Sequence, residues 1–194
     1  MKIKFLTLFL VLGAFAAQAA VILSVDPANQ SVALGNQAIV QVRGSGLALN
    51  QVIGAYDVTL QWNSALVSLA SATFGGALGT NTIESSVSGA NSVNMASVSL
   101  DSSAILAPLQ IPEPFLLFTL TFNTLAAGIT PVEFLPRGTF IIADGDGNII
   151  SSASGTDGSI EITGANGGIP EPSTIVLISA GLVALVVKSR RRRK

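Results

Sequence analysis

The side chains of this chain that could perform chemistry are carboxylates, hydroxyls and amides, because the sequence contains no cysteine and no histidine. Without cysteine there are no disulfide bonds, thiolate nucleophiles or cysteine-ligated zinc sites. Without histidine, the serine–histidine–aspartate and cysteine–histidine catalytic machineries are excluded, together with the commonest metal ligand. Three kinds of chemistry remain: catalysis by paired carboxylates, calcium binding by an acidic loop, and sugar recognition by aromatic rings.

One acidic loop imitates the start of a calcium-binding loop, because Asp144-Gly145-Asp146-Gly147-Asn148 follows the pattern D-x-D-x-N. A complete EF-hand loop has glycine at its sixth position and a bidentate glutamate at its twelfth. This chain has Ile149 and Gly155 at those two positions. We therefore expect a tight hairpin turn, with weak calcium binding by Asp144, Asp146 and Asn148 as the alternative.

Other carboxylates could supply the pair that a glycosidase needs, and the candidates are Asp57, Glu84, Asp101, Glu113 and Glu133. The sequence places no two of these five residues together, so we expect them to carry surface charge and the protein not to be an enzyme. Tyr56 and Trp62 could form an aromatic platform for a sugar. They alternate with Val58 and Leu60, which favours a place in the core instead. No glycine-rich loop opens a helix after a strand, so no cofactor is expected.

Charge is distributed unevenly along the chain. Between Ala20 and Gly168 there are ten acidic residues and two basic ones, which gives this part a net charge of −8, whereas the whole chain has −1. Such a surface repels phosphate backbones, so nucleic-acid binding is not expected. The other basic residues gather at the two ends of the chain, which indicates targeting segments on either side of one domain.

Residues 1–19 have the organisation of a signal peptide. Lys2 and Lys4 form a positively charged start, an apolar run follows over residues 5–15, and Ala17-Gln18-Ala19 supplies the small residues of a cleavage site. The apolar run is short for a membrane span and polar sequence follows it, which argues against a permanent anchor. We expect signal peptidase to cleave after Ala19, with cleavage after Ala20 as the alternative.

The C-terminal end has three parts in strict order. A glycine-rich linker over residues 164–168 is followed by Ile169-Pro170-Glu171-Pro172-Ser173 and then by an apolar stretch over residues 174–187. The chain closes on a basic cluster made of Lys188, Arg190, Arg191, Arg192, Arg193 and Lys194. Such a cluster stays on the cytoplasmic side of a membrane and stops translocation.

The apolar stretch predicts a single transmembrane helix that is short for the bilayer. Residues 173–187 would measure about 22 Å as a helix at about 1.5 Å per residue, against a hydrocarbon core of about 30 Å. A span of this length requires snorkelling of the basic residues or local thinning of the bilayer. It therefore suits a temporary membrane stop better than a permanent one.

Pro170, Glu171 and Pro172, followed by the apolar stretch and the basic cluster, resemble the PEP-CTERM sorting signal over residues 169–194. The resemblance implies that exosortase, a membrane protease of exopolysaccharide-producing bacteria, processes the tail for release or surface attachment. A plain tail anchor is the alternative. The same four residues recur at Ile111-Pro112-Glu113-Pro114. No basic cluster follows this internal copy, so we expect it to be a proline-rich loop before a strand.

The body between the two ends has the alternation of a half-buried antiparallel sheet. Apolar residues occupy every second position of three segments, as Ala38, Val40 and Val42, then Tyr56, Val58, Leu60 and Trp62, and finally Leu116, Phe118, Leu120 and Phe122. Turn signals such as Gly75-Gly76 and Asp157-Gly158 separate such segments. We therefore predict an all-β fold over residues 20–163, either a sandwich or a jelly roll.

The segment from Ile53 to Trp62, which leads into Ala65-Leu66-Val67, resembles the cohesin-type domain. The resemblance extends over about residues 21–163. It includes Leu120-Thr121-Phe122 and the segment Ala126-Ala127-Gly128, which ends the strand that contains these three residues. It implies a cohesin-like jelly-roll sandwich, akin to some carbohydrate-binding modules, and a non-catalytic binding or structural role. Cohesins dock dockerin modules, so a dockerin-like module or a polysaccharide is the partner that it implies.

These observations together predict an exported, exosortase-sorted protein of the cell envelope or extracellular matrix, associated with exopolysaccharide or biofilm. Its contact with the membrane is expected to be transient. One alternative is a module whose main task is to bind a carbohydrate or a dockerin. Another is a carboxylate-based glycoside hydrolase.

Overall fold

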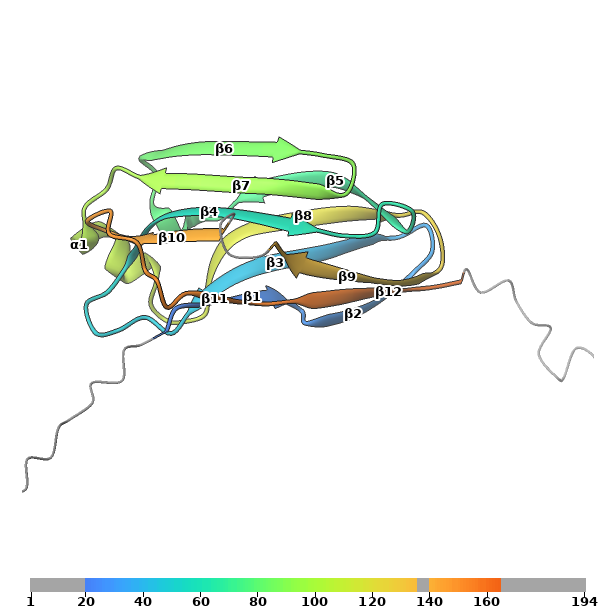
Figure 1. Ribbon diagram of the computed structural model, residues 1–194, viewed down its shortest axis with the longest axis horizontal. Helices are drawn as coiled ribbons and strands as arrows, with labels where there is room; N and C mark the ends of the chain where they lie inside the picture. The colour runs from blue at the N-terminus through green and yellow to red at the C-terminus, as the bar shows by residue number, and fades with distance from the viewer. Residues whose placement is uncertain (1–19, 136–139, 165–194) are drawn as a thin grey trace, which may run out of the picture.

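The computed structural model describes residues 20–135 and 140–164, which form a sandwich of two β-sheets (Figure 1). The predicted all-β class is confirmed for this part of the chain, because its helical elements are confined to α1 (Ser103–Leu106) and two 3₁₀ turns, η1 (Gly76–Leu78) and η2 (Ala107–Leu109). Within the described ranges, no helix is both long enough and apolar enough to cross a membrane. The expected signal peptide and the expected transmembrane helix lie outside the described residues.

The first sheet has five strands in the order β11-β1-β3-β8-β5. Its strands are β1 (Ile22–Asp26), β3 (Gln37–Ser45), β5 (Val67–Phe74), β8 (Phe115–Thr124) and β11 (Ser154–Thr156). All neighbours are antiparallel except β1 and β11, which run parallel. The long strands β3 and β8 therefore form the centre of this sheet, and β5 forms one edge.

The second sheet has seven strands, with the order β2-β12-β9-β4-β7-β6 and with β10 paired to β4 beside this path. Its strands are β2 (Asn29–Ala33), β4 (Ile53–Gln61), β6 (Thr82–Ser88), β7 (Ser92–Ser99), β9 (Gly128–Phe134), β10 (Phe140–Asp144) and β12 (Gly158–Thr163). The chain passes from the first sheet to the second between β1 and β2, where Pro27 cannot donate a ladder hydrogen bond. β2 then pairs in parallel with β12.

The core lies between the two sheets and includes most of the residues that the alternation predicts. Ala38, Val40 and Val42 of β3 are buried, as are Val58 and Leu60 of β4. Burial of such side chains is the main favourable term in folding, at roughly 25 cal/mol per Å² of apolar surface.

Aromatic rings join the two sheets across the core. The Trp62 ring, just after β4, packs edge-on against the Phe122 ring of β8, with centroids 5.0 Å apart. Tyr56 and Trp62 are only 3% and 5% exposed. The expectation that these two residues belong to the core is confirmed, and the alternative of an aromatic sugar platform is wrong.

The predicted face of β8 is wrong at one position. Leu116 is half-buried, whereas Leu117 is 1% exposed and lies in the core. The register explains the change, because Val42 pairs with Phe118 while the next residue, Arg43, pairs with Leu116. The extra residue on β8 is a β-bulge, and a bulge inverts the alternation on one side of it.

Tyr56 makes the alkaline stability of the fold measurable, because it is the only tyrosine in the chain. Its hydroxyl donates a hydrogen bond to the carbonyl oxygen of Leu117 at 3.2 Å. Burial, with a smaller contribution from the charge of Glu84, raises the pKa of Tyr56 well above its ordinary value of 10.0.

A raised pKa in the folded state means that the stabilisation is fully present below the unfolded-state pKa and is lost as the pH rises above about 10. We expect the absorbance of tyrosinate to stay absent well above pH 10 and then to rise together with the loss of the far-ultraviolet circular dichroism signal. A tyrosinate signal that rises near pH 10 while the fold is intact would contradict the buried, hydrogen-bonded position.

Candidate functional site

The two ends of the sandwich differ in charge. The loops over residues 46–52, 100–114 and 144–153 lie together at one end, because Gly44 pairs with Phe115 and Ile53 pairs with Asp144. This end, on the left in Figure 1, carries Asp101, Glu113, Asp144 and Asp146. We call it the acidic end.

A groove crosses the acidic end. It consists of two hollows, of about 390 Å³ and about 300 Å³, which share Ala48 and Gln51 in their walls. Leu49, Ile111 and Glu113 line the larger hollow, and the smaller hollow includes Asp144. Leu49 is 93% exposed and Ile111 is 69% exposed, so the acidic-end groove offers aliphatic surface together with two carboxylates, those of Glu113 and Asp144.

Glu113, from the internal Pro-Glu-Pro copy, positions one wall of this groove. Its two carboxylate oxygens accept hydrogen bonds from the backbone N–H of Gly46, at 2.7 Å, and of Leu47, at 2.9 Å. Hydrogen bonds to an ionised acceptor are stronger than neutral ones. The carboxylate therefore holds the loop that carries Leu49 against the segment that carries Ile111.

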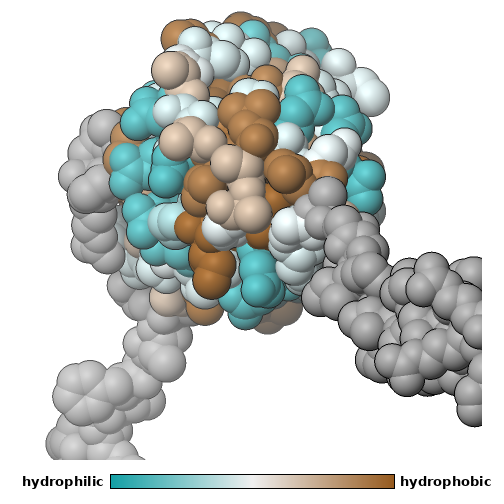
Figure 2. Space-filling model, turned by 90° about the vertical axis from the view of Figure 1, so that its right-hand side faces the viewer, coloured by the Kyte–Doolittle hydropathy of each residue, from teal (hydrophilic) through white to brown (hydrophobic). Residues whose placement is uncertain are grey.

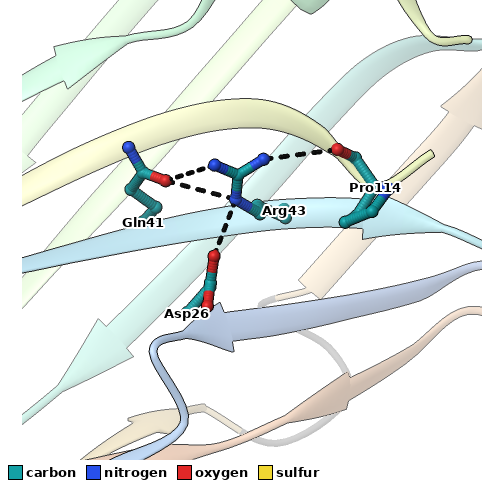
Figure 3. A network of polar contacts seen from close by, with 4 residues as sticks. All are labelled: Asp26, Gln41, Arg43 and Pro114. Atoms are coloured by element: carbon teal, nitrogen blue, oxygen red, sulfur yellow. Dashed lines mark hydrogen bonds and ion pairs between the residues drawn. The ribbon is translucent and has the colours of Figure 1, made fainter. Parts of the chain in front are cut away.

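Arg43 of β3 fixes the next residue of the same copy (Figure 3). Its guanidinium group donates to the carbonyl oxygen of Pro114 at 3.3 Å and to Oε1 of Gln41 at 2.6 Å, and it forms an ion pair with Asp26 at 2.9 Å. β8 begins directly afterwards at Phe115. The prediction of a proline-rich loop before a strand is confirmed for this copy.

The Asp144 loop closes on itself. Oδ1 of Asp144 accepts hydrogen bonds from the backbone N–H of Asp146, at 3.0 Å, and of Asn148, at 2.9 Å, while the Asn148 side chain donates to Oδ2 at 3.1 Å. These bonds, those of Asn148 first, lower the pKa of the Asp144 carboxyl group. Ala143 forms an antiparallel bridge with Ile149. The loop is therefore a hairpin turn, as predicted.

This turn offers few ligands to a metal ion. Among residues 20–135 and 140–164, no group of three or more acidic side chains could hold one. We expect 1 mM calcium or excess chelator to leave the melting temperature of the protein unchanged, because Asp144 already accepts hydrogen bonds within the turn. A calcium dissociation constant below about 1 μM in calorimetric titration would show instead that Asp144, Asp146 and Asn148 form a true site.

The other carboxylates are bound to separate local partners. Asp57 accepts a hydrogen bond from the side chain of Asn94 at 2.6 Å, and Glu133 accepts one from the side chain of Gln61 at 3.1 Å. Glu84 accepts from Thr82 on the edge strand β6, and Asp101 accepts from the backbone of Asn81. Each carboxylate is thus held by its own neighbours, and these contacts give no support to a glycosidase pair.

Aromatic rings do not form the surface of this site. Every aromatic residue in the described part of the chain is buried or half-buried. The exposed Leu49 and Ile111 could not be predicted as site residues, because isolated apolar residues in loops have no period. The only sign of this surface in the sequence is that Leu49 stands beside Asn50 and Ile111 beside Pro112, both of which are residues typical of turns.

The comparisons with known proteins concern the tail and the body separately. Residues 168–193 match the family model of the PEP-CTERM protein-sorting motif. The chain thus carries this sorting motif, as expected from Pro170, Glu171 and Pro172, although the three residues lie outside the described part. Among curated proteins, no sequence matches the chain.

The described body is similar to cohesin modules of known structure. The cohesin of the Coh-OlpA–Doc918 complex from Clostridium thermocellum superposes with a TM-score of 0.59 at 16% identity, covering 74% of this chain and 99% of that one. The body has the cohesin fold. The sixth cohesin of Acetivibrio cellulolyticus scaffoldin B, solved with the Cel5 dockerin, gives 0.57 at 18% identity and the same coverage.

A third neighbour shows that the cohesin fold also occurs within a larger enzyme. The cohesin module of a family 33 glycoside hydrolase from Clostridium perfringens gives a TM-score of 0.56 at 14% identity, covering 76% of this chain and 98% of the module. At these identities the likeness concerns the fold alone. The partner of the body must therefore be argued from its own surface.

Proposed function

We propose that this chain is an exported protein whose tail is processed by exosortase, and whose cohesin-fold body is a non-catalytic binding module on the cell surface or in the extracellular matrix. The match to the PEP-CTERM sorting motif over residues 168–193 carries the first part of the proposal. The apolar stretch and the basic cluster behind Pro170-Glu171-Pro172 support it. The signal peptide over residues 1–19 would start the route that the tail completes.

The order of these segments defines the route. Signal peptidase would release the N-terminus at Ala20, the body would cross the inner membrane, and the basic cluster would hold the tail at the cytoplasmic face. Exosortase would then act near Pro170-Glu171-Pro172. A role in an exopolysaccharide matrix or biofilm follows from the resemblance of the tail to such sorting signals, and it belongs to this proposal.

Intact-mass measurement of the surface-exposed protein tests the route. We expect the mature chain to begin at Ala20 and to lack Thr174 to Lys194. In a host without exosortase, the membrane fraction should hold the chain with its whole tail. A mature surface protein that still carries Arg190 to Lys194 would mean that the tail is a plain anchor.

For the body, we infer that the acidic-end groove binds a protein partner. The aliphatic side chains of Leu49 and Ile111 are exposed on its wall, and their burial against another apolar surface is favourable in proportion to the area removed from water. No exposed ring in the described residues offers a sugar a stacking surface. Carboxylates around the groove favour a partner with basic residues beside its apolar contact.

A dockerin-like module is one such partner, since two of the cohesin neighbours were solved with dockerins. Purified protein on beads should retain the partner from culture medium of the host, and the double variant Leu49→Ser/Ile111→Ser should lose it. The matched control is Leu125→Ser/Ile129→Ser, which removes one leucine and one isoleucine outside this groove. Equal retention of the partner by both variants would refute the proposal that it binds in the acidic-end groove. Binding of the protein to a glycan array would instead favour the carbohydrate-binding alternative.

A further inference from the structure

The end of the sandwich opposite the acidic end carries no charge in its loops. Four segments connect the strands there, over residues 33–37, 62–66, 88–92 and 124–128, and none contains an acidic or basic residue. Figure 2 looks onto this end and shows apolar side chains gathered at its centre. We call these side chains the apolar end, and they are Leu34, Leu66, Leu125, Ala126, Ala127 and Ile129.

Hydrogen bonds between the loops hold this surface in place. The backbone N–H of Leu125 donates to the carbonyl oxygen of Leu66 at 2.7 Å. The hydroxyl of Thr124 accepts from the N–H of Gly35 at 2.8 Å and donates to the carbonyl oxygen of Asn36 at 2.9 Å. The apolar end is therefore preformed, so covering it requires little ordering of the chain.

Two side chains of the apolar end stand out into solvent. Leu125 is 52% exposed and Ile129 is 66% exposed. The nearest carboxylate along the sheet is Glu161, which pairs with Ile129 across β12 and β9. A surface that covers this end would therefore bury aliphatic groups, with the Glu161 carboxylate beside Ile129.

The tail leaves the body at this same end. β12 ends at Thr163, whose carbonyl oxygen accepts a hydrogen bond from the N–H of Leu34 at 2.9 Å. Nine residues lie between Gly164 and Thr174, where the apolar stretch of the tail begins, so ten residue steps join the two. Ten residues span at most about 36 Å. The apolar end therefore cannot move far from the membrane while the tail is inserted.

We propose that the apolar end rests on the lipid surface of the inner membrane while the tail is still attached; this step depends on the membrane insertion of the tail in the proposed function. The exposed aliphatic side chains of this end, whose four loops carry no charge, enter the interfacial region of a bilayer favourably. The acidic end, at the far side of the sandwich, points away from the bilayer, so its carboxylates stay in water. Docked in this way, the body holds Pro170-Glu171-Pro172 at the membrane surface, where a membrane protease can reach it.

Site-specific labels can test this orientation in the full chain, because the sequence has no cysteine of its own. Asn91→Cys places a fluorophore in a loop of the apolar end, and Ser102→Cys places one at the acidic end. The labelled protein, with its tail, is reconstituted into phosphatidylcholine vesicles that contain a lipid with a nitroxide on the head group. We expect strong quenching and a blue-shifted emission at position 91, and neither at position 102.

The inserted tail alone would keep position 91 nearer to the membrane than position 102. A pair of matched variants therefore distinguishes contact of the apolar end with lipid from mere attachment by the tail. Leu125→Ser/Ile129→Ser should lose the blue shift and most of the quenching at position 91. Leu49→Ser/Ile111→Ser, which removes the same two residue types at the acidic end, should keep both. Because all four side chains are more than half exposed, none of these changes removes a core contact.

The outcomes distinguish the inference from the function on which it rests. If the protein does not float with the vesicles in a density gradient, the tail does not insert, and the inference is refuted together with that part of the proposed function. Flotation with unchanged quenching in Leu125→Ser/Ile129→Ser would refute docking alone and leave the sorting proposal intact. Loss of a dimer, rather than of quenching, in the same variant would show that a second copy covers the apolar end, and this would also overturn the inference.

Discussion

Replacing Pro170 and Glu171 by alanine is expected to leave the protein in the inner membrane with its tail at full length. Proline fixes its own φ angle and pushes the residue before it towards extended conformations, which are the form that proteases bind. The apolar stretch and the basic cluster remain in this variant, so translocation still stops at the same place. Processing should therefore be lost while membrane insertion is kept, which intact-mass measurement of each cell fraction would show.

The chain supplies its own matched control for this experiment, because Pro112 and Glu113 repeat the same pair inside the body. Alanine at these two positions should leave the removal of the tail unchanged. It should also lower the free energy of unfolding, by about 1–3 kcal/mol, because the Glu113 carboxylate no longer bonds Gly46 and Leu47. Loss of tail processing in a folded Pro112→Ala/Glu113→Ala variant would contradict the assignment of the signal to the terminal copy.

The two copies show why a short motif has no fixed meaning. Inside the body, the glutamate of the motif is a structural acceptor, and Phe115 directly after it is buried beside Gly44. A side chain at position 44 would meet the Phe115 ring at 2.7 Å, so strand β3 needs glycine there. In the tail, the same residues precede an apolar stretch and a basic cluster. The context, rather than the four residues, distinguishes the two functions.

Much of the fold could be predicted because buried antiparallel strands repeat every two residues. Val58 and Leu60 on β4 are fully buried, as that period requires. The period failed at Leu116 and Leu117, where a bulge on β8 inverts the two faces. A bulge depends on how the partner strand pairs, so nothing local in the sequence marks it. The parallel pairing of β1 with β11, which are far apart in the chain, was equally invisible.

Of the two candidate sites, the sorting motif could be predicted from the sequence and the acidic-end groove could not. The sorting motif could be predicted because a linear signal is read as consecutive residues, and it needs no fold. The acidic-end groove is assembled from three loops that are distant in sequence, and only the strand pairings bring Leu49 beside Ile111. Gln110, which lines the same groove, likewise gave no signal in the sequence. A polar residue in a loop is expected at the surface, yet this side chain is fully buried.

Gln110→Ala is expected to be among the most damaging single changes in the body. The Gln110 side chain accepts a hydrogen bond from the N–H of Ile53 at 2.8 Å, and it donates to the carbonyl oxygens of Ile53, at 2.7 Å, and of Ala77, at 3.1 Å. Alanine removes all three bonds and leaves buried backbone groups without partners, each at a cost of about 1–3 kcal/mol. We expect a loss of about 3–5 kcal/mol, a large part of the total for a domain of this size.

Urea unfolding of the two proteins would measure this loss, with Gln37→Ala as the control. Gln37 is exposed, and its side chain bonds only the exposed side chain of Asn123, so its removal should change the free energy of unfolding by less than about 0.5 kcal/mol. Equal effects of the two changes would mean that Gln110 does not hold its loop in solution. If Gln110 does hold it, Gln110→Ala should also weaken binding of the partner more than its stability loss explains. Two of the three bonds join Gln110, which lines the acidic-end groove, to Ile53, the first residue of β4.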